Sequence, residues 1–216
     1  MSVDRHINFF ELQKVCALEG CPLCRLVSDR AERYMDNLLF EHVADRGFRA
    51  VHRSAGGFCA YHARNLASFR DGLAVAILGR DILEDRINSF KKGKAWKPKD
   101  PCPVCIEKSR IEKEYLGFIA GAEGSGDDER ELRFLFEKSS GLCAPHYEKL
   151  LRTVKKVPRW LKDFQERRFD DLMARTLHFI ELSAYGRQAE FAELSEADQL
   201  VWKELTLTLN SPNSDS

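Results

Sequence analysis

The feature that most constrains this chain is a pair of short cysteine motifs that occurs twice. CPLC at residues 21–24 is followed by GFCAYH at 57–62, and CPVC at 102–105 is followed by GLCAPH at 141–146. The CPxC and CxxH halves are separated by 34 residues in the first copy and 37 in the second. Six of the seven cysteines belong to this pattern, which leaves only Cys16 outside it. Repetition in the same order and at similar spacing predicts an internal duplication.

The residue types in this pattern are those that bind zinc. Zinc favours tetrahedral sulfur and nitrogen ligands, and three cysteines with one histidine form one of its common structural sites. Proline after the first cysteine suits the first turn of a helix, and a helix N-terminus favours thiolate over thiol. The three-residue step of CxxH places both side chains on one face of a helical turn. We therefore expect two Cys3His centres that bind two zinc ions.

The simplest assignment takes each set of ligands from one copy. It gives one site made of Cys21, Cys24, Cys59 and His62, and a second site made of Cys102, Cys105, Cys143 and His146. The alternative is crossed pairing, in which the CPxC of one copy meets the CxxH of the other. Spacing along the chain leaves both arrangements open.

Two other uses of these cysteines are considered. An iron–sulfur cluster is the alternative cofactor, but such clusters usually take four cysteines, so the histidines favour zinc. Thioredoxin-like redox proteins place CPxC after a strand in a βαβ unit. Because no strand pattern precedes Cys21 or Cys102, this redox interpretation is disfavoured.

Hydrophobic periodicity predicts an all-α fold. Apolar residues recur at three- and four-residue spacing from Leu23 to about Val43, over residues 73–90, and after Pro158 as far as Ile180. Ser195 and Asp198 resemble a capping box that opens a last helix through Val201 and Leu205. No alternating runs or hairpin signals are present. The expected architecture is a duplicated helical scaffold with two Cys3His sites.

The predicted boundaries follow the repeat. Residues 1–92 form the first CPxC–CxxH repeat, 93–101 a basic linker, and 102–192 the second repeat. Residues 193–216 contain the C-terminal helix and a tail that is expected to be disordered from Asn210 onward.

Balanced charge argues against a dedicated nucleic-acid-binding protein. Lys plus Arg and Asp plus Glu each number 34, whereas nucleic-acid affinity normally depends on excess positive charge. Two basic segments with a tryptophan, Lys91–Lys99 around Trp96 and Arg152–Lys162 around Trp160, keep nucleic-acid binding as a second alternative. The competing interpretation is a solvated surface with both tryptophans docked on the core, and the charge balance favours it.

The remaining expectations concern compartment and class of function. The first ten residues contain no apolar stretch typical of a signal peptide, and no run has the length of a membrane span. We expect a cytoplasmic protein, whose thiols stay reduced, with no membrane partner. No Gly-rich phosphate loop and no nucleophile with its base is recognisable, so no catalytic residue is assigned. A closed metal site then predicts a structural or interaction module that binds a protein partner.

These motifs resemble those of a family of uncharacterised prokaryotic helical proteins, domain-of-unknown-function family 6062. The resemblance rests on CPLC at 21–24, GFC at 57–59 with His62, LAVAILGRDIL at 73–83, and the second CPVC and GLC with His146. It extends from about residue 15 to residue 185. The resemblance implies the duplicated helical architecture and adds no activity.

Overall fold

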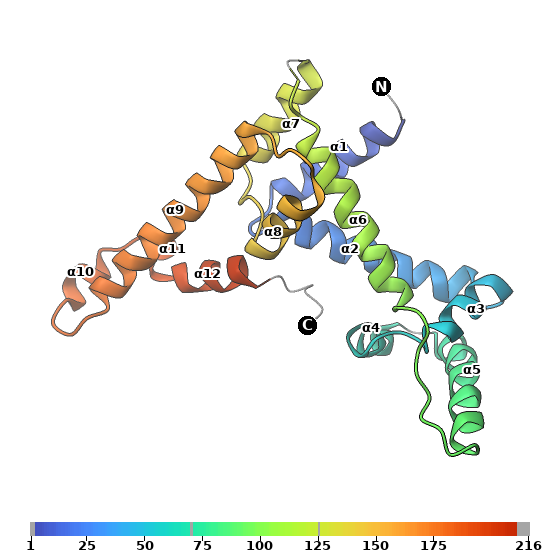
Figure 1. The fold of residues 1–216 in the computed structure, drawn as a ribbon. Helices are drawn as coiled ribbons and strands as arrows, with labels where there is room; N and C mark the ends of the chain where they lie inside the picture. The colour runs from blue at the N-terminus through green and yellow to red at the C-terminus, as the bar shows by residue number, and fades with distance from the viewer. Residues whose placement is uncertain (1–2, 70, 125, 211–216) are drawn as a thin grey trace. The chain divides into compact units, whose positions relative to one another are not determined.

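The protein is helical throughout the part of the chain that the structure, a computed structural model, describes: residues 3–69, 71–124 and 126–210 (Figure 1). No strand occurs among these residues, which confirms the predicted all-α fold class. The chain divides into two compact units. Unit 1 contains the residues up to Leu26 and those from Glu112 onward, and unit 2 contains Val27–Ile111. The duplication of the scaffold remains a prediction.

Most helices follow one another through short connections, and a longer one, residues 91–102, joins α5 to α6 (Figure 1). They are α1 (Val3–Cys16), α2 (Pro22–Glu41), α3 (Arg46–Ser54), α4 (Ala60–Asn65), a 3-10 turn η1 (Leu66–Ser68), α5 (Gly72–Phe90), α6 (Pro103–Ala120), α7 (Asp127–Glu137), α8 (Ala144–Thr153), α9 (Arg159–Leu182), α10 (Gln188–Ala192), α11 (Glu196–Gln199) and α12 (Val201–Leu209). The expectation that each CPxC proline opens a helix is confirmed, since α2 begins at Pro22 and α6 at Pro103. Proline fits there because the first helical residues have no intrahelical partner for their N–H groups.

Unit 1 has a core built from helices that lie far apart in the sequence. Tyr115 and Leu116 of α6, Phe136 of α7 and Leu161 of α9 are fully buried. The ring of Phe136 packs edge-on against that of Phe164 of α9, with 5.7 Å between ring centroids. Each fully buried apolar side chain of this size stabilises the fold by about 1.5–3 kcal/mol.

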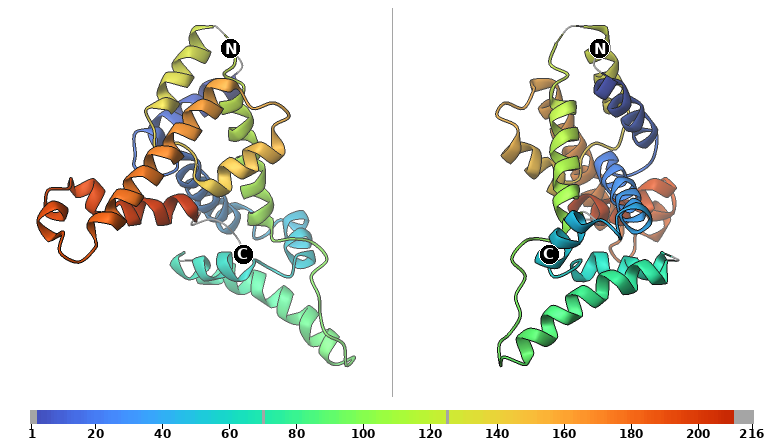
Figure 2. Two further views of the ribbon diagram at one scale, coloured as in Figure 1. Left: turned by 60° about the vertical axis from the view of Figure 1, so that its left-hand side comes forward. Right: turned by 90° about the vertical axis from the view of Figure 1, so that its right-hand side faces the viewer.

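The C-terminal helices of unit 1 fold back along α9 (Figure 2). Arg175 of α9 donates to Asp198 at 2.7 Å and to Glu204 at 2.8 Å. Ser195 caps α11 as expected, because its hydroxyl oxygen accepts from the N–H of Asp198 at 3.1 Å. The single last helix predicted from Ser195 onward is wrong. Leu200 leaves helical geometry, with φ −105° and ψ 10°, and separates α11 from α12.

Unit 2 is held together by an apolar layer and by ion pairs between α3 and α5. Leu39 of α2 packs in one cluster with Ala74 and Leu78 of α5. Arg49 of α3 donates twice to Oδ2 of Asp81 of α5, at 2.6 and 2.8 Å, and only 6% of the Asp81 side chain is exposed. Both N–H groups converge on one carboxylate oxygen, and charge-assisted hydrogen bonds of this kind hold α3 on α5.

Two further expectations concern the C-terminal tail and membrane-spanning helices. Of the tail predicted to be disordered, residues 211–216 lie outside the described residues. Within the described ranges, no helix combines the length and apolar character that crossing a bilayer requires.

Candidate metal centres

The eight predicted ligands gather into two groups of four. Centre 1, in unit 1, consists of Cys21, Cys24, Cys143 and His146. Centre 2, in unit 2, consists of Cys59, His62, Cys102 and Cys105. Within each group, the sulfur atoms and one ring nitrogen all lie within 4.8 Å of one another. Both groups therefore have a donor set and a size that could hold a metal ion.

The assignment of each site to a single copy of the repeat is wrong. Centre 1 combines the first CPxC with the second CxxH, and centre 2 combines the second CPxC with the first CxxH. This is the crossed alternative. The physical reason lies in the two units. Unit 2 is the continuous segment Val27–Ile111, which contains the first CxxH and the second CPxC, whereas unit 1 brings the first CPxC to the second CxxH.

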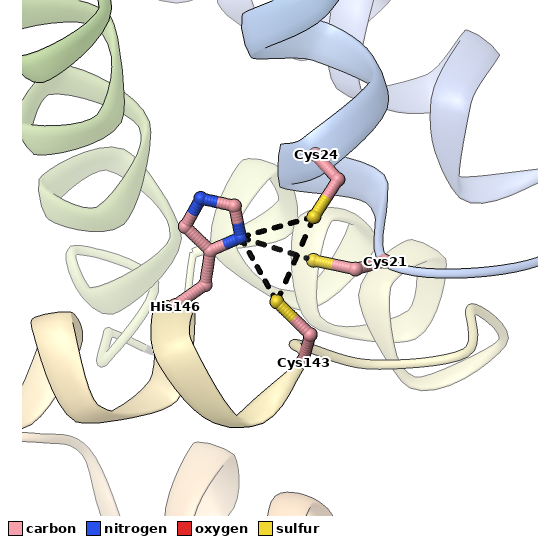
Figure 3. A group of neighbouring side chains, drawn as sticks. All are labelled: Cys21, Cys24, Cys143 and His146. Carbon is pink, nitrogen blue, oxygen red and sulfur yellow. Dashed lines mark hydrogen bonds between the residues drawn. The ribbon is translucent and has the colours of Figure 1, made fainter. Parts of the chain in front are cut away.

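In centre 1, three sulfurs surround one nitrogen of His146 (Figure 3). Nδ1 of His146 lies 3.1 Å from Sγ of Cys143, 3.3 Å from that of Cys24 and 3.5 Å from that of Cys21. The sulfurs of Cys24 and Cys143 are 3.6 Å apart. Cys24, Cys143 and His146 are buried, and Cys21 is half-buried.

Centre 2 has the same geometry, and its ligands are slightly more exposed to solvent. Nδ1 of His62 lies 3.2 Å from Sγ of Cys59, 3.5 Å from that of Cys105 and 3.6 Å from that of Cys102. The sulfurs of Cys59 and Cys105 are 3.7 Å apart. Here two cysteines, Cys59 and Cys105, are half-buried, compared with one in centre 1.

These separations match the edges of a tetrahedron around one ion. Zn–S bonds of about 2.3 Å and Zn–N bonds of about 2.0 Å imply edges of about 3.8 Å between sulfurs and about 3.5 Å between sulfur and nitrogen. Hydrogen bonding alone explains the arrangement poorly, because one imidazole nitrogen carries a single proton or a single lone pair. It cannot satisfy three sulfurs at once, whereas a shared cation bonds to all four donors.

Local folding delivers the ligands in the same way to both centres. Gly57 and Gly141 adopt positive φ angles of 91° and 74°, which an L side chain rarely adopts. Each glycine turns the chain so that the cysteine two residues later becomes the N-cap of a helix, Cys59 for α4 and Cys143 for α8. The histidine then lies in the first turn. At the starts of α2, α6 and α8, the positive end of the helix dipole also favours thiolates.

The charge balance of centre 1 favours a cation among thiolates. Burial acts to raise the pKa of the Cys21 thiol, but hydrogen bonds with Cys143, Cys24 and His146 hold that pKa well below its usual value. Burial would lower the pKa of His146, yet its contacts with the thiols and with Glu112 raise it to about 11. The hydrogen bonds with Cys21 and Cys24 also raise the pKa of the Cys143 thiol. The four side chains thus share their protons, and deprotonation of all three thiols requires a cation among them.

A carboxylate supports the histidine of centre 1 from behind. Nε2 of His146, on the far side of the ring from the sulfurs, lies 3.4 Å from Oε1 of Glu112. The other oxygen of Glu112 accepts from the ammonium of Lys149. Burial acts to raise the pKa of Glu112, but the bonds from His146 and Lys149 lower it, so the carboxylate stays charged. Carboxylate–histidine pairs of this kind fix the ring orientation and raise the basicity of the ligating nitrogen.

Centre 2 has different surroundings. When the two CPxC motifs are aligned, the position of Glu112 is occupied by Ala31. Ala31 is buried in an apolar cluster that contains Cys102 and contacts Cys59 and Cys105. The exposed edge of the centre is covered by aromatic and cationic groups: the ring of Tyr61 lies edge-on to His62 at 5.1 Å, and the ammonium of Lys108 lies 5.4 Å from the centre of the Tyr61 ring.

Glu112 and Lys149 are functional candidates that the sequence interpretation missed. Lys149 follows His146 by three residues and so shares its helix face. Glu112, however, follows Cys105 by seven residues, and Cys105 belongs to centre 2. Without the crossed arrangement there was no reason to associate Glu112 with His146.

The residues outside the centres take mainly structural positions. The lone Cys16 is buried as expected, and burial raises the pKa of its thiol to about 12. Trp96 is half-buried in unit 2, where Arg86 stacks 5.1 Å from its ring centre. Trp160 is half-buried in unit 1 and packs edge-on against Phe136, with 6.2 Å between ring centroids. Both tryptophans therefore contribute to packing.

Comparisons with known proteins give a partial family match and no activity. Residues 11–98 match the family of unknown function DUF6062. An uncharacterized 23.9 kDa protein in the xynA 3' region of Caldicellulosiruptor sp. (strain Rt8B.4) is 32% identical over 102 residues, which cover 45% of this chain and 50% of that relative. The chain thus spans about half the length of this curated relative. No solved structure matches. The family match ends before the second CPxC and CxxH motifs, which lie outside it.

Proposed function

We propose that this chain is a zinc-binding protein whose two mononuclear Cys3His centres pin a helical scaffold for binding a protein partner in the cytoplasm. Four protein ligands around each ion leave no open position for water or substrate, so the proposed role of the metal is structural. A structural zinc ion stabilises a small domain by about 10 kcal/mol or more. Each ion would join a CPxC motif from one copy of the repeat to a CxxH motif from the other.

The observation that carries this proposal is the close spacing of the donor atoms. All four donors of a centre lie within 4.8 Å of one another. An iron–sulfur cluster distributes its ligands over two or more irons, which places them farther apart than ligands on one ion. The spacing therefore favours a single ion. The Cys3His donor set in turn favours zinc among single ions.

Metal analysis of the purified protein tests the proposal. Protein purified without oxygen and without added metal is expected to be colourless and to contain two zinc ions per chain by elemental analysis. Cys16→Ala is the matched control, because it removes a cysteine outside both centres and should also retain two ions. Brown protein with iron and visible absorption that bleaches on reduction would support the iron–sulfur alternative. Fewer than one ion per folded chain would contradict metal binding altogether.

A further inference from the structure

Unit 1 contains a cavity that neither metal centre uses. It lies among α1, α6 and α7, and its volume is about 450 Å³. Small-molecule sites in proteins typically range from about 300 to 1,000 Å³. The apolar part of the lining includes Phe9 of α1, Phe118 of α6 and Leu132 of α7. These rings and the leucine would contact the hydrophobic body of a ligand.

A glycine keeps one wall of this cavity open. Gly117 lies inside α6, where glycine costs about 1 kcal/mol of helix stability relative to alanine. A Cβ atom added at Gly117 would meet no heavy atom within 4 Å, so no neighbouring group in the described chain requires glycine there. The space above Gly117 is part of the cavity. Side chains introduced at this position would enter that space without disturbing the core.

The polar part of the lining is negative. Asp128 and Glu131 lie three residues apart on α7, and both line the cavity. Neither forms an ion pair with any residue of the described chain. The neighbouring arginines are directed elsewhere: Arg130 pairs with Asp127, and Arg133 donates to the carbonyl of Gly124. The cavity therefore presents two exposed carboxylates, without a cationic partner in the described chain, beside an apolar floor.

We propose that this cavity binds a small organic cation, an ammonium group carried on an aryl or alkyl body. The carboxylates of Asp128 and Glu131 would attract the ammonium group, and aromatic faces such as those of Phe9 and Phe118 attract cations as well as apolar groups. A carboxylate ligand of the same shape would be repelled. The site is separate from both metal centres, so its occupant does not depend on the identity of the metal.

Three probes that differ only in their head group test the proposal. Binding of 4-phenylbutylamine, 4-phenylbutanol and 4-phenylbutyrate to the zinc-loaded chain is measured by calorimetry and by NMR chemical-shift changes at Gly117. The amine is expected to bind at least about tenfold more tightly than the alcohol, a difference of about 1.4 kcal/mol. The carboxylate is expected not to bind.

Two variants separate the cavity from non-specific binding. Gly117→Leu fills the open wall and should abolish binding of the amine, while helical content and zinc content stay unchanged. Asp128→Asn with Glu131→Gln keeps the shape and should reduce the preference for amine over alcohol to less than about threefold. Equal affinity for all three probes in the wild-type chain, or unchanged amine binding by Gly117→Leu, would overturn the proposal.

Discussion

The two metal centres share their inner ligands and differ in what lies behind them. In both, a glycine with positive φ positions a cysteine at a helix start, and Nδ1 of the histidine faces three sulfurs. Behind His146, however, Glu112 and Lys149 form a charged pair, whereas centre 2 has the buried Ala31 at the position of Glu112. The repeated motif therefore specifies the candidate ligands, while helix positions outside the motif determine the environment of each centre.

This difference suggests that the two ions have unequal affinities. Outer carboxylates that hold a ligating histidine typically change metal affinity by 10- to 100-fold. Centre 1 has such a carboxylate and one half-buried cysteine, and centre 2 has two half-buried cysteines.

Pairs of cysteine substitutions should reveal which ligands share an ion. Cys24→Ser with Cys143→Ser removes two ligands from centre 1 only, so one zinc ion per chain should remain. Cys24→Ser with Cys59→Ser damages both centres and should leave none. Loss of an ion removes about 10 kcal/mol of stabilisation, so the affected unit should unfold. Zinc content by elemental analysis and residual helicity by circular dichroism measure the two effects.

The opposite pattern would restore pairing within each copy of the repeat. In that case Cys24→Ser with Cys143→Ser would leave no ion, and Cys24→Ser with Cys59→Ser would leave one. The ligand sets of centres 1 and 2 given above would then be wrong.

Removal of the outer carboxylate should weaken centre 1 alone. Glu112→Ala is expected to lower the zinc affinity of centre 1 by about 10- to 100-fold, because His146 loses the acceptor that orients its ring. Glu112→Gln retains an oxygen acceptor and should recover part of the affinity. Competition with a chromogenic chelator resolves the two ions, and Glu137→Gln, an exposed change on α7, is the control. An equal loss at both centres would indicate a general loss of stability.

The buried ion pair of unit 2 should contribute stability that depends on pH. Burial acts to raise the pKa of Asp81, but its hydrogen bonds with Arg80 and Arg49 lower it below the usual 3.8. A carboxyl group whose pKa is lowered on folding contributes stability above its unfolded pKa, and the contribution is lost as pH falls through the folded pKa. Asp81→Asn should therefore cost about 2 kcal/mol near neutral pH and progressively less as the pH falls below the usual pKa of 3.8.

Urea unfolding of wild type and Asp81→Asn across this pH range provides the measurement. Taking the difference between the two proteins at each pH cancels the loss of zinc that acid causes in both. A cost that does not change with pH would show that the side chain acts through packing and not through its charge.

The smallest effect is expected at Gly117 of α6, in unit 1. Because a Cβ there meets no atom within 4 Å, Gly117→Ala should stabilise unit 1 by about 1 kcal/mol through helix propensity. Calorimetry should show a higher transition temperature for unit 1 and no change for unit 2. A shift of both transitions together would indicate that the two units unfold as one.

Much of the fold and all eight ligands could be predicted from the sequence, because both depend on local patterns. Periodic apolar residues predict α5 and α9, and the prolines after Cys21 and Cys102 mark the starts of α2 and α6. The capping box at Ser195 was also correct, but the break at Leu200 was missed. Nothing in the side chains around Leu200 forbids a helix, and the interruption accompanies the docking of α11 and α12 on α9.

The pairing of the motifs and the role of Glu112 could not be predicted from local sequence patterns. Both depend on which segments fold together. Either CxxH motif supplies the same two ligand types, so ligand chemistry alone does not decide which CPxC motif shares an ion with it. Only the assembly of unit 1 from both ends of the chain brings Cys24 next to Cys143 and Glu112 next to His146. Long-range packing decides the question.

The most direct test of the crossed arrangement is a cadmium–proton correlation NMR spectrum of the chain reconstituted with two cadmium ions in place of zinc. Coupling through the metal–sulfur bond identifies the cysteines on each ion without any substitution. We predict two cadmium resonances, one coupled to the β-protons of Cys21, Cys24 and Cys143, the other to those of Cys59, Cys102 and Cys105. A resonance coupled to Cys21, Cys24 and Cys59 together would contradict the account.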